Sequence, residues 1–144
     1  MVLSTLLTRY YYRQLNNLVY INLHMITDIV NRQDIETLVD RFYERVQANT
    51  LLAPVFSHVD WPKHLPVMYN FWSSMLLGEL SYRGNPFEKH IHLNIGTEHF
   101  EQWLKLFRET VDQHFVGSNA EEIKQRAESI AGIFQHKLGL TPKQ

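Results

Sequence analysis

The sequence predicts an all-α domain, and three observations support this prediction. Apolar residues recur at three- and four-residue intervals over several long stretches from residue 34 onward, which is the spacing of one face of a helix. No stretch alternates apolar and polar residues for long, as a half-buried strand would. Prolines and glycines fall mainly between the periodic stretches or in first turns. At 144 residues the chain suits one domain with a real core.

Composition narrows the possible functions. A net charge of −1 gives no electrostatic reason to expect nucleic acid or a membrane as partner. The absence of cysteine excludes disulfides, thiolate metal sites, iron–sulfur clusters and covalent attachment of a c-type haem. No apolar run reaches the roughly 18 residues of a membrane span, and no glycine-rich phosphate loop is present. We therefore expect a cytoplasmic protein.

Residues 1–24 differ from the rest of the chain. They contain no acidic residue, and three tyrosines follow one another at positions 10–12. Arg9 and Arg13 interrupt the apolar residues and no small-residue cleavage site follows, so a secretory signal fits poorly. We expect residues 1–24 to be an extension of unknown role outside a domain of residues 25–144. The alternative is an extra helix that packs on the domain.

The first two helices of the domain are expected on either side of a break centred on Pro54. Asp34 is the expected N-cap of the first helix. Pro62 and Pro66 both suit a first helical turn, so we expect the second helix to be regular only from Pro66, with His64 at its loose entrance. The apolar faces of the two helices are Ile35, Leu38, Val39, Phe42 and Val46, and then Trp61, Leu65, Met68, Trp72, Met75 and Leu76.

Three further elements follow. Asn85 and Pro86 predict a short helix over "NPFEKHIHL" at residues 85–93. A loop at 94–98 leads into the next helix, which Gly117 closes, and "SNAE" at 118–121 has the form of a capping box that opens the last helix. Gly139 is expected to end that helix. The two apolar faces are Phe100, Trp103, Leu104, Phe107 and Val111, and then Ile123, Ala127, Ile130, Ala131, Phe134 and Leu138.

His90 and His92 raise the question of a metal site. In a strand, residues two apart share a face and can bind one zinc ion, whereas on a helix they lie about 200° apart and cannot. The helical start at Asn85 therefore predicts that at most one of the two histidines is a ligand.

Taken alone, these residues leave three functions open. A zinc-dependent hydrolase would use His90, His92 and a third ligand such as His99 if residues 88–93 were extended. A cofactor-free helical interaction module would use the aromatic residues only as core. A haem protein would need one axial imidazole, apolar walls and a few hydrogen-bond donors on the opposite side, which an all-α domain rich in aromatic donors can supply.

Three segments of the sequence resemble the group III (P-type) truncated haemoglobins, a bacterial globin family. They are "WPKHLPVMYNFWSSMLLGELSYRGNPFEKHIHL" at 61–93, "RFYERV" at 41–46 and "FEQWLKLF" at 100–107, and the similarity runs from about residue 34 to 138. The combination is specific although each piece alone is weak. The resemblance implies a truncated globin, a 2-on-2 helical sandwich around haem b, which is iron protoporphyrin IX held without covalent bonds.

The resemblance also implies roles for individual residues. His90 matches the proximal haem-iron ligand, whereas His92 matches a variable position and receives no role. Tyr43, His64 and Trp103 match the distal residues that stabilise a bound gas. The remaining cofactor-binding positions implied by the resemblance are Phe42, Met68 and Phe71, with Trp72 as wall and core.

The implied function is to bind dioxygen and other diatomic gases such as NO and CO. Three polar donors in one pocket should slow oxygen release more than a carrier needs, which favours chemistry such as nitric oxide dioxygenation or peroxide reduction. An unidentified reductase would be the partner. Lys63, Lys89 and Arg83 lie near the segments where the haem carboxylates are expected, without an assignment to any of them.

Overall fold

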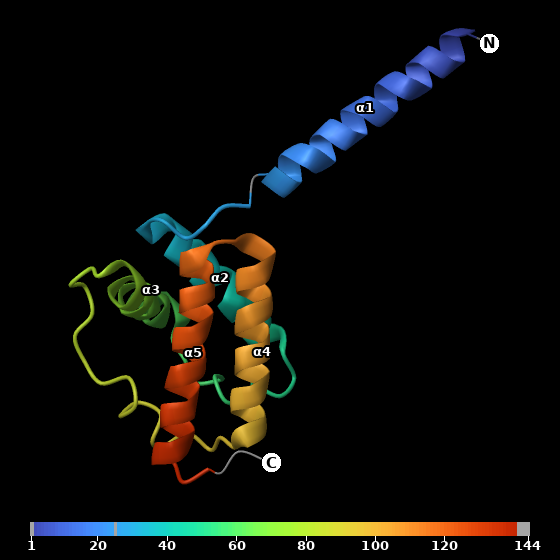
Figure 1. Ribbon diagram of the computed structural model, residues 1–144. Helices are drawn as coiled ribbons and strands as arrows, with labels where there is room; N and C mark the ends of the chain where they lie inside the picture. Colours follow the sequence, from blue (N-terminus) through green and yellow to red (C-terminus); the bar gives the residue numbers. More distant parts are fainter. Residues whose placement is uncertain (1, 25, 141–144) are drawn as a thin grey trace.

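The computed structural model describes residues 2–24 and 26–140, and this part of the chain is helical (Figure 1). Its helices are α1 (Val2–His24), α2 (Arg32–Ala48), α3 (Trp61–Leu77), α4 (Thr97–His114) and α5 (Ser118–Lys137). Within the described residues β-structure is limited to one isolated bridge between Thr27 and Phe115. The predicted all-α class is confirmed.

Helices α2 to α5 form the globular part as two stacked pairs. α2 packs on α3, α4 packs on α5, and the two pairs meet through α2 with α4 and α3 with α5. Figure 1 shows α4 and α5 side by side, with α2 and α3 behind and beside them. This is the two-over-two arrangement that the resemblance implied. The largest fully buried side chains at its centre are Phe42, Phe107, Ile29, Ile35, Leu38, Leu52 and Ile123.

Helix α2 begins one turn before the expected cap. Asn31 is the N-cap: its side chain accepts the Asp34 N–H at 3.0 Å, and the Asp34 carboxylate accepts the Asn31 N–H at 3.2 Å. Asp34 is thus the third helical residue of a capping box, and its assignment as N-cap was wrong. The first turn carries no apolar residue before Ile35, so hydrophobic periodicity could not locate it.

Helix α3 begins at Trp61, five residues before the expected start of regular helix. The carbonyl of Asp60 accepts both the Lys63 N–H at 3.1 Å and the His64 N–H at 2.9 Å. Pro66 lies inside the helix, where its missing N–H leaves one carbonyl without a helical donor. The expectation of a loose entrance at His64 was therefore wrong, because hydrogen bonds fix the backbone of this turn.

The expected short helix at residues 85–93 is also absent. Residues 86–92 form successive turns, in which the His90 N–H donates to Phe87 O at 2.8 Å and the Leu93 N–H to His90 O at 3.1 Å. The Asn85 side chain accepts the Phe87 N–H at 3.1 Å, which is the hydrogen bond of an Asx-turn. Asn85 and Pro86 therefore begin a turn, and residues 85–93 form no α-helix.

Helix α5 is capped by a residue distant in sequence. The Asp28 carboxylate accepts the N–H groups of Asn119 at 2.9 Å and Ala120 at 2.8 Å. A side chain on Gly117, which has φ 144°, would place Cβ 2.4 Å from Asp28 Cγ, so only glycine permits this approach. The N-cap is Gly117 with no side-chain cap from residues 118–121, and the expected Ser-x-x-Glu box was wrong. Gly139, with φ 71°, follows the end of the helix as predicted.

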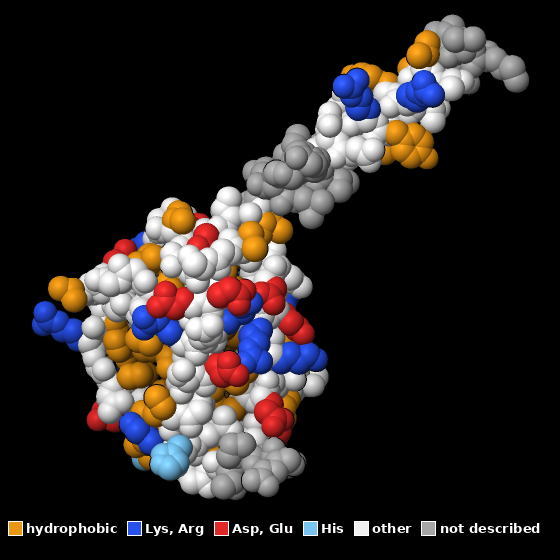
Figure 2. All heavy atoms as spheres, viewed as in Figure 1, with side chains coloured by type: hydrophobic (Ala, Val, Ile, Leu, Met, Phe, Trp, Pro, Cys, Tyr) orange, Lys and Arg blue, Asp and Glu red, His pale blue; other side chains and the backbone are white. Residues whose placement is uncertain are grey.

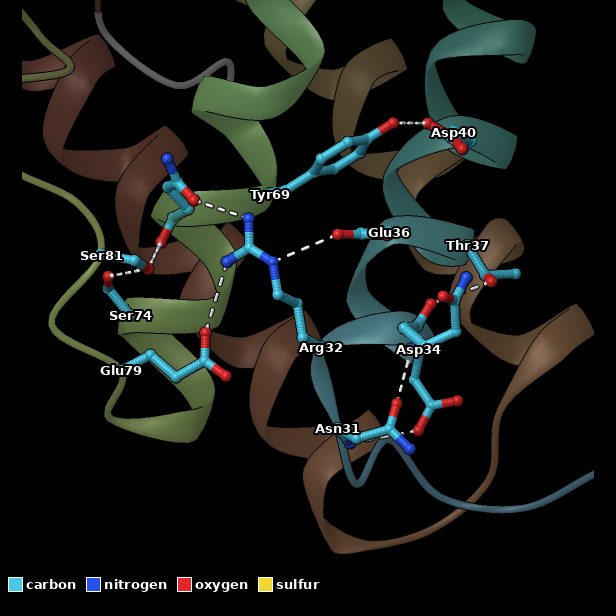
Figure 3. Close-up of polar contacts among 12 residues, drawn as sticks. Asn31, Arg32, Asp34, Glu36, Thr37, Asp40, Tyr69, Ser74, Glu79 and Ser81 are labelled. Atoms are coloured by element: carbon cyan, nitrogen blue, oxygen red, sulfur yellow. Dashed lines mark hydrogen bonds and ion pairs between the residues drawn. The ribbon is translucent and has the colours of Figure 1, made fainter.

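Polar contacts join α2 to α3 (Figure 3). Arg32 of α2 donates to Asn70 of α3 at 2.7 Å and pairs with Glu79, just after α3, at 3.4 Å. Within α2 it also pairs with Glu36 at 3.1 Å. The Tyr69 hydroxyl, also on α3, donates to the Asp40 carboxylate on α2. Together with the buried face of α2, these contacts fix the relative position of the two helices that carry Tyr43 and His64.

Helix α1 projects away from the globular part (Figure 1). Every side chain described in it, over residues 5–17, is exposed, and Figure 2 shows hydrophobic and basic side chains along it. The described part of α1 does not pack on the domain, although the boundary at residue 25 stays a prediction. None of the helices in the described residues has the length and apolar character needed to cross a membrane.

Candidate functional site

A cavity of about 450 Å³ opens between α2, α3, α4, α5 and the segments 52–60 and 86–95. This volume lies within the range of cofactor sites. Six residues that the sequence singled out line its wall: Tyr43, His64, Met68, Phe71, His90 and Trp103. Trp72 lines it as well. Residues far apart in the sequence thus meet in one place.

His90 presents one ring nitrogen to this cavity. Its Nδ1 lies 2.5 Å from the carbonyl oxygen of Pro86, so Nδ1–H is the donor and Nε2 keeps its lone pair. Burial lowers the pKa of His90, and the bond to Pro86 offsets this only in part. The ring also packs on Phe134 of α5, with centroids 5.0 Å apart. A neutral imidazole with a fixed orientation and a free Nε2 is suited to bind a metal axially.

His92 does not share this site. It is exposed and lines a neighbouring groove instead of the cavity. His99 lines both, but its Nδ1 accepts the Gly96 N–H at 3.0 Å at the start of α4. Within the described residues, no three histidine, cysteine or acidic side chains are placed to hold a metal ion. The zinc alternative therefore has no support.

Tyr43 offers a hydroxyl that the described part of the protein leaves unpaired. The ring is buried and lies 4.9 Å from Phe42, 5.0 Å from Trp61 and 6.0 Å from His64, between ring centroids. No hydrogen bond within the described residues uses the hydroxyl, and burial raises its pKa. The hydroxyl is thus a permanent donor in the cavity wall, and such donors are rarely left without an acceptor.

Trp103 and His64 add to the same wall. The Trp103 ring stacks on Phe107 with an interplanar angle of 13°, and its indole N–H has no acceptor among the described residues. Burial lowers the pKa of His64, and smaller electrostatic interactions with His90, Lys89 and His58 lower it further, so its half-buried ring is mainly neutral near pH 7. The cavity accordingly combines apolar walls with the free Nε2 of His90 and with the unpaired donors of Tyr43 and Trp103. This combination fits a haem with a small ligand.

Phe42 is the one predicted pocket residue that the structure does not bring into the cavity. It is 1% exposed and lies behind the wall, in ring contact with Tyr43, Trp103 and Phe107. These rings enclose Phe42 in the core, and Tyr43 forms the cavity wall at this position of α2.

Two residues of the site were missed. The role of Pro86 could have been inferred, because it precedes His90 by four residues. Phe134 gave no signal beyond its place on an apolar helix face.

The cavity mouth carries cationic side chains. Exposed Lys63 and Lys89 both line it, whereas Arg83 does not. Lys63 is paired with Asp60 at 3.4 Å. No ion pair within the described residues involves Lys89, which leaves its ammonium group available to a ligand carboxylate.

Known proteins resemble most of this chain in sequence. The family model for bacterial-like globins matches residues 26–137. The chain is 37% identical over 118 residues to the group 3 truncated hemoglobin ctb of Campylobacter jejuni, covering 77% of this chain and 93% of the relative. It is 29% identical to the group 1 truncated hemoglobin GlbN of a Nostoc species, over 69% of this chain and 83% of the relative.

Solved structures resemble the fold of this chain. The group III truncated hemoglobin of Campylobacter jejuni superimposes with a TM-score of 0.73 at 38% identity, over 79% of this chain and 95% of that one. A truncated oxygen-avid haemoglobin from Bacillus subtilis superimposes with a TM-score of 0.66 at 28% identity, over 73% and 93%.

Proposed function

We propose that this chain, which belongs to the bacterial-like globin family as a group 3 truncated haemoglobin, holds bound dioxygen and uses it to convert nitric oxide to nitrate. As a member of this family, the chain holds haem b without covalent bonds and binds diatomic gases. When bound, the haem iron supplies the reversible bond to the gas and the electron density that makes its outer oxygen partly negative.

His90 would hold the haem iron. The Pro86 carbonyl fixes its tautomer and ring direction, which raises the basicity of Nε2 and orients it toward the cavity. Phe134 limits rotation of the same ring. The neighbouring turns thus prepare one imidazole nitrogen for the metal before any ligand binds.

Tyr43 and Trp103 are the proposed donors to the gas. Each carries a hydrogen that no described residue accepts, and both line the same cavity. A hydrogen bond to a charged acceptor contributes about 1.5–3 kcal/mol, so each donor should slow dioxygen escape roughly 10- to 150-fold. These unpaired donors in one apolar cavity carry the proposal, because such retention exceeds what a carrier needs and gives a second gas time to react.

The reaction needs one electron per turnover. Dioxygen and nitric oxide together contain the atoms of nitrate but one electron fewer, so an external donor must return that electron. We propose a reductase as this partner. Rapid mixing of the oxygenated protein with nitric oxide should yield one nitrate per protein, and Tyr43→Phe should give less because it loses dioxygen first. Loss of dioxygen without nitrate would reject this reaction.

Peroxide reduction is the second candidate, and His64 is the observation that favours it. Its ring is neutral, lines the cavity and makes no hydrogen bond within the described residues, so it can accept a proton from hydrogen peroxide. Two electrons and two protons would then give two waters. Peroxidase turnover that falls in His64→Ala, with no nitrate formed from nitric oxide, would favour this reaction over the first.

A further inference from the structure

A hydrogen bond fixes the backbone at His64, so the position of its ring depends on the side-chain rotamer. The His64 N–H is bonded to Asp60 O at 2.9 Å within the first turn of α3. Any opening of the cavity past His64 must therefore come from rotation of its side chain.

Ring packing is what restrains that side chain. Neither nitrogen of the His64 ring has a hydrogen-bond partner within the described residues. The ring instead meets Tyr43 edge-on at 6.0 Å and 80°, and Trp61 edge-on at 5.8 Å and 75°. Trp61 precedes His64 by three residues on the same helix, and helical side chains lean toward the N-terminus. The His64 ring therefore lies over the turn that carries Trp61.

Trp61 does not belong to the cavity wall itself. It is absent from the lining that Tyr43 and His64 share, and it packs behind both of them. Its ring centroid lies 5.0 Å from Tyr43 and 6.1 Å from Phe56. One side chain outside the cavity thus packs against both Tyr43 and His64 of the cavity wall.

We propose that Trp61 is a positioning residue that holds the His64 ring across the cavity mouth and so sets the rate of gas entry. The proposal rests on the gas-binding function above. An aromatic contact corresponds to a factor of roughly 2 to 13 in an equilibrium. Loss of the indole should therefore raise the population of the open His64 rotamer, and the association rate, by a factor in that range.

Flash photolysis of the carbon monoxide complex tests this in four proteins: wild type, Trp61→Leu, His64→Ala and the double variant. Trp61→Leu should speed association by a factor of roughly 2 to 13. It should add nothing in the His64→Ala background, because the residue it positions is gone. Trp61→Phe keeps a smaller ring and should give a smaller increase that likewise disappears without His64. This variant carries the test if Trp61→Leu does not retain haem.

Tyr82→Leu is the matched control. It removes a partly buried aromatic side chain that contacts Phe71 at 5.2 Å and does not line the cavity, and it should leave association unchanged. An equal increase from Tyr82→Leu, an effect of Trp61→Leu that persists without His64, or no effect in either Trp61 variant would overturn the proposal. Failure of the wild type to bind carbon monoxide would instead reject the gas-binding function.

Discussion

At the scale of single residues, the clearest contrast is between His90 and His92. His90 has a fixed tautomer and lines the cavity, whereas His92 is exposed beside it. Helical spacing does not explain this separation, because residues 86–92 form turns and no helix. The role of His90 came from the resemblance, and the structure adds the Pro86 carbonyl that orients its ring.

We expect His90→Ala to lose stable haem binding and His92→Ala to keep it. His90→Ala removes the cavity-lining imidazole whose ring the Pro86 carbonyl orients. Haem titration of both apoproteins, followed by absorbance, measures this difference. Equal loss in both variants, or full retention in His90→Ala, would reject the assignment of His90.

Removing a distal donor should act mainly on dioxygen escape. Tyr43→Phe and Trp103→Phe should each raise the dissociation rate roughly 10- to 150-fold, since each removes a hydrogen bond to a partly negative oxygen. His64→Ala should mainly change the rate of ligand entry. Stopped-flow dissociation and flash-photolysis association rates separate these effects. A large rise in dissociation from His64→Ala, with the other two variants unchanged, would reverse the roles.

At the scale of helices, hydrophobic periodicity identified α2, α3, α4 and α5 and most of their buried faces. Periodicity could not locate the first turns of α2 and α3, because the start of α2 is polar at Asn31 and the first turn of α3 contains Pro62. The cap of α5 was beyond local reasoning, because Asp28 lies about 90 residues from the N–H groups that it accepts.

Asp28→Ala should lower the free energy of unfolding by about 0.5–2 kcal/mol, the usual effect of losing a helix cap. Glu101→Ala, which removes an exposed carboxylate on α4, is the control and should change stability little. Urea unfolding of both variants at pH 7 makes the comparison. An equal change in the two proteins would argue against the cap.

The contribution of Asp28 should also depend on pH. Burial raises the pKa of Asp28, but hydrogen bonds from Asn119, Ala120, Ile29 and Ser118 outweigh it, and the pKa falls below its unfolded value of 3.8. Because the folded pKa is the lower one, the stabilisation is present above pH 3.8 and is lost as the pH falls through the folded pKa. The stability difference between wild type and Asp28→Ala should therefore shrink in that acid range. A difference that stayed constant there would contradict this account.

At the scale of the whole molecule, the segment that matches the globin family model begins at residue 26. Asp28 and the fully buried Ile29 belong to it, whereas the described side chains of α1 are exposed. We expect a chain beginning at Met25 to bind haem with the same absorbance spectrum as the full chain. If that shorter chain were insoluble or haem-free, the extension would be part of the fold.

The overall architecture followed from the sequence more securely than the site did. Apolar faces at helical spacing are a property of each segment, so the helices could be expected, whereas their two-over-two pairing was implied by the resemblance. The cavity depends on segments meeting in space, so residues such as Phe134 and Phe42 could be placed only in the folded chain. The resemblance supplied what spacing could not, namely which histidine faces the cavity.

The most direct test of the central claim is absorbance of the full chain titrated with haem and then exposed to carbon monoxide after reduction. We expect a Soret band that saturates at one haem per chain and shifts when carbon monoxide binds, and we expect His90→Ala not to saturate. A protein that took up no haem, or whose band did not respond to carbon monoxide, would contradict it.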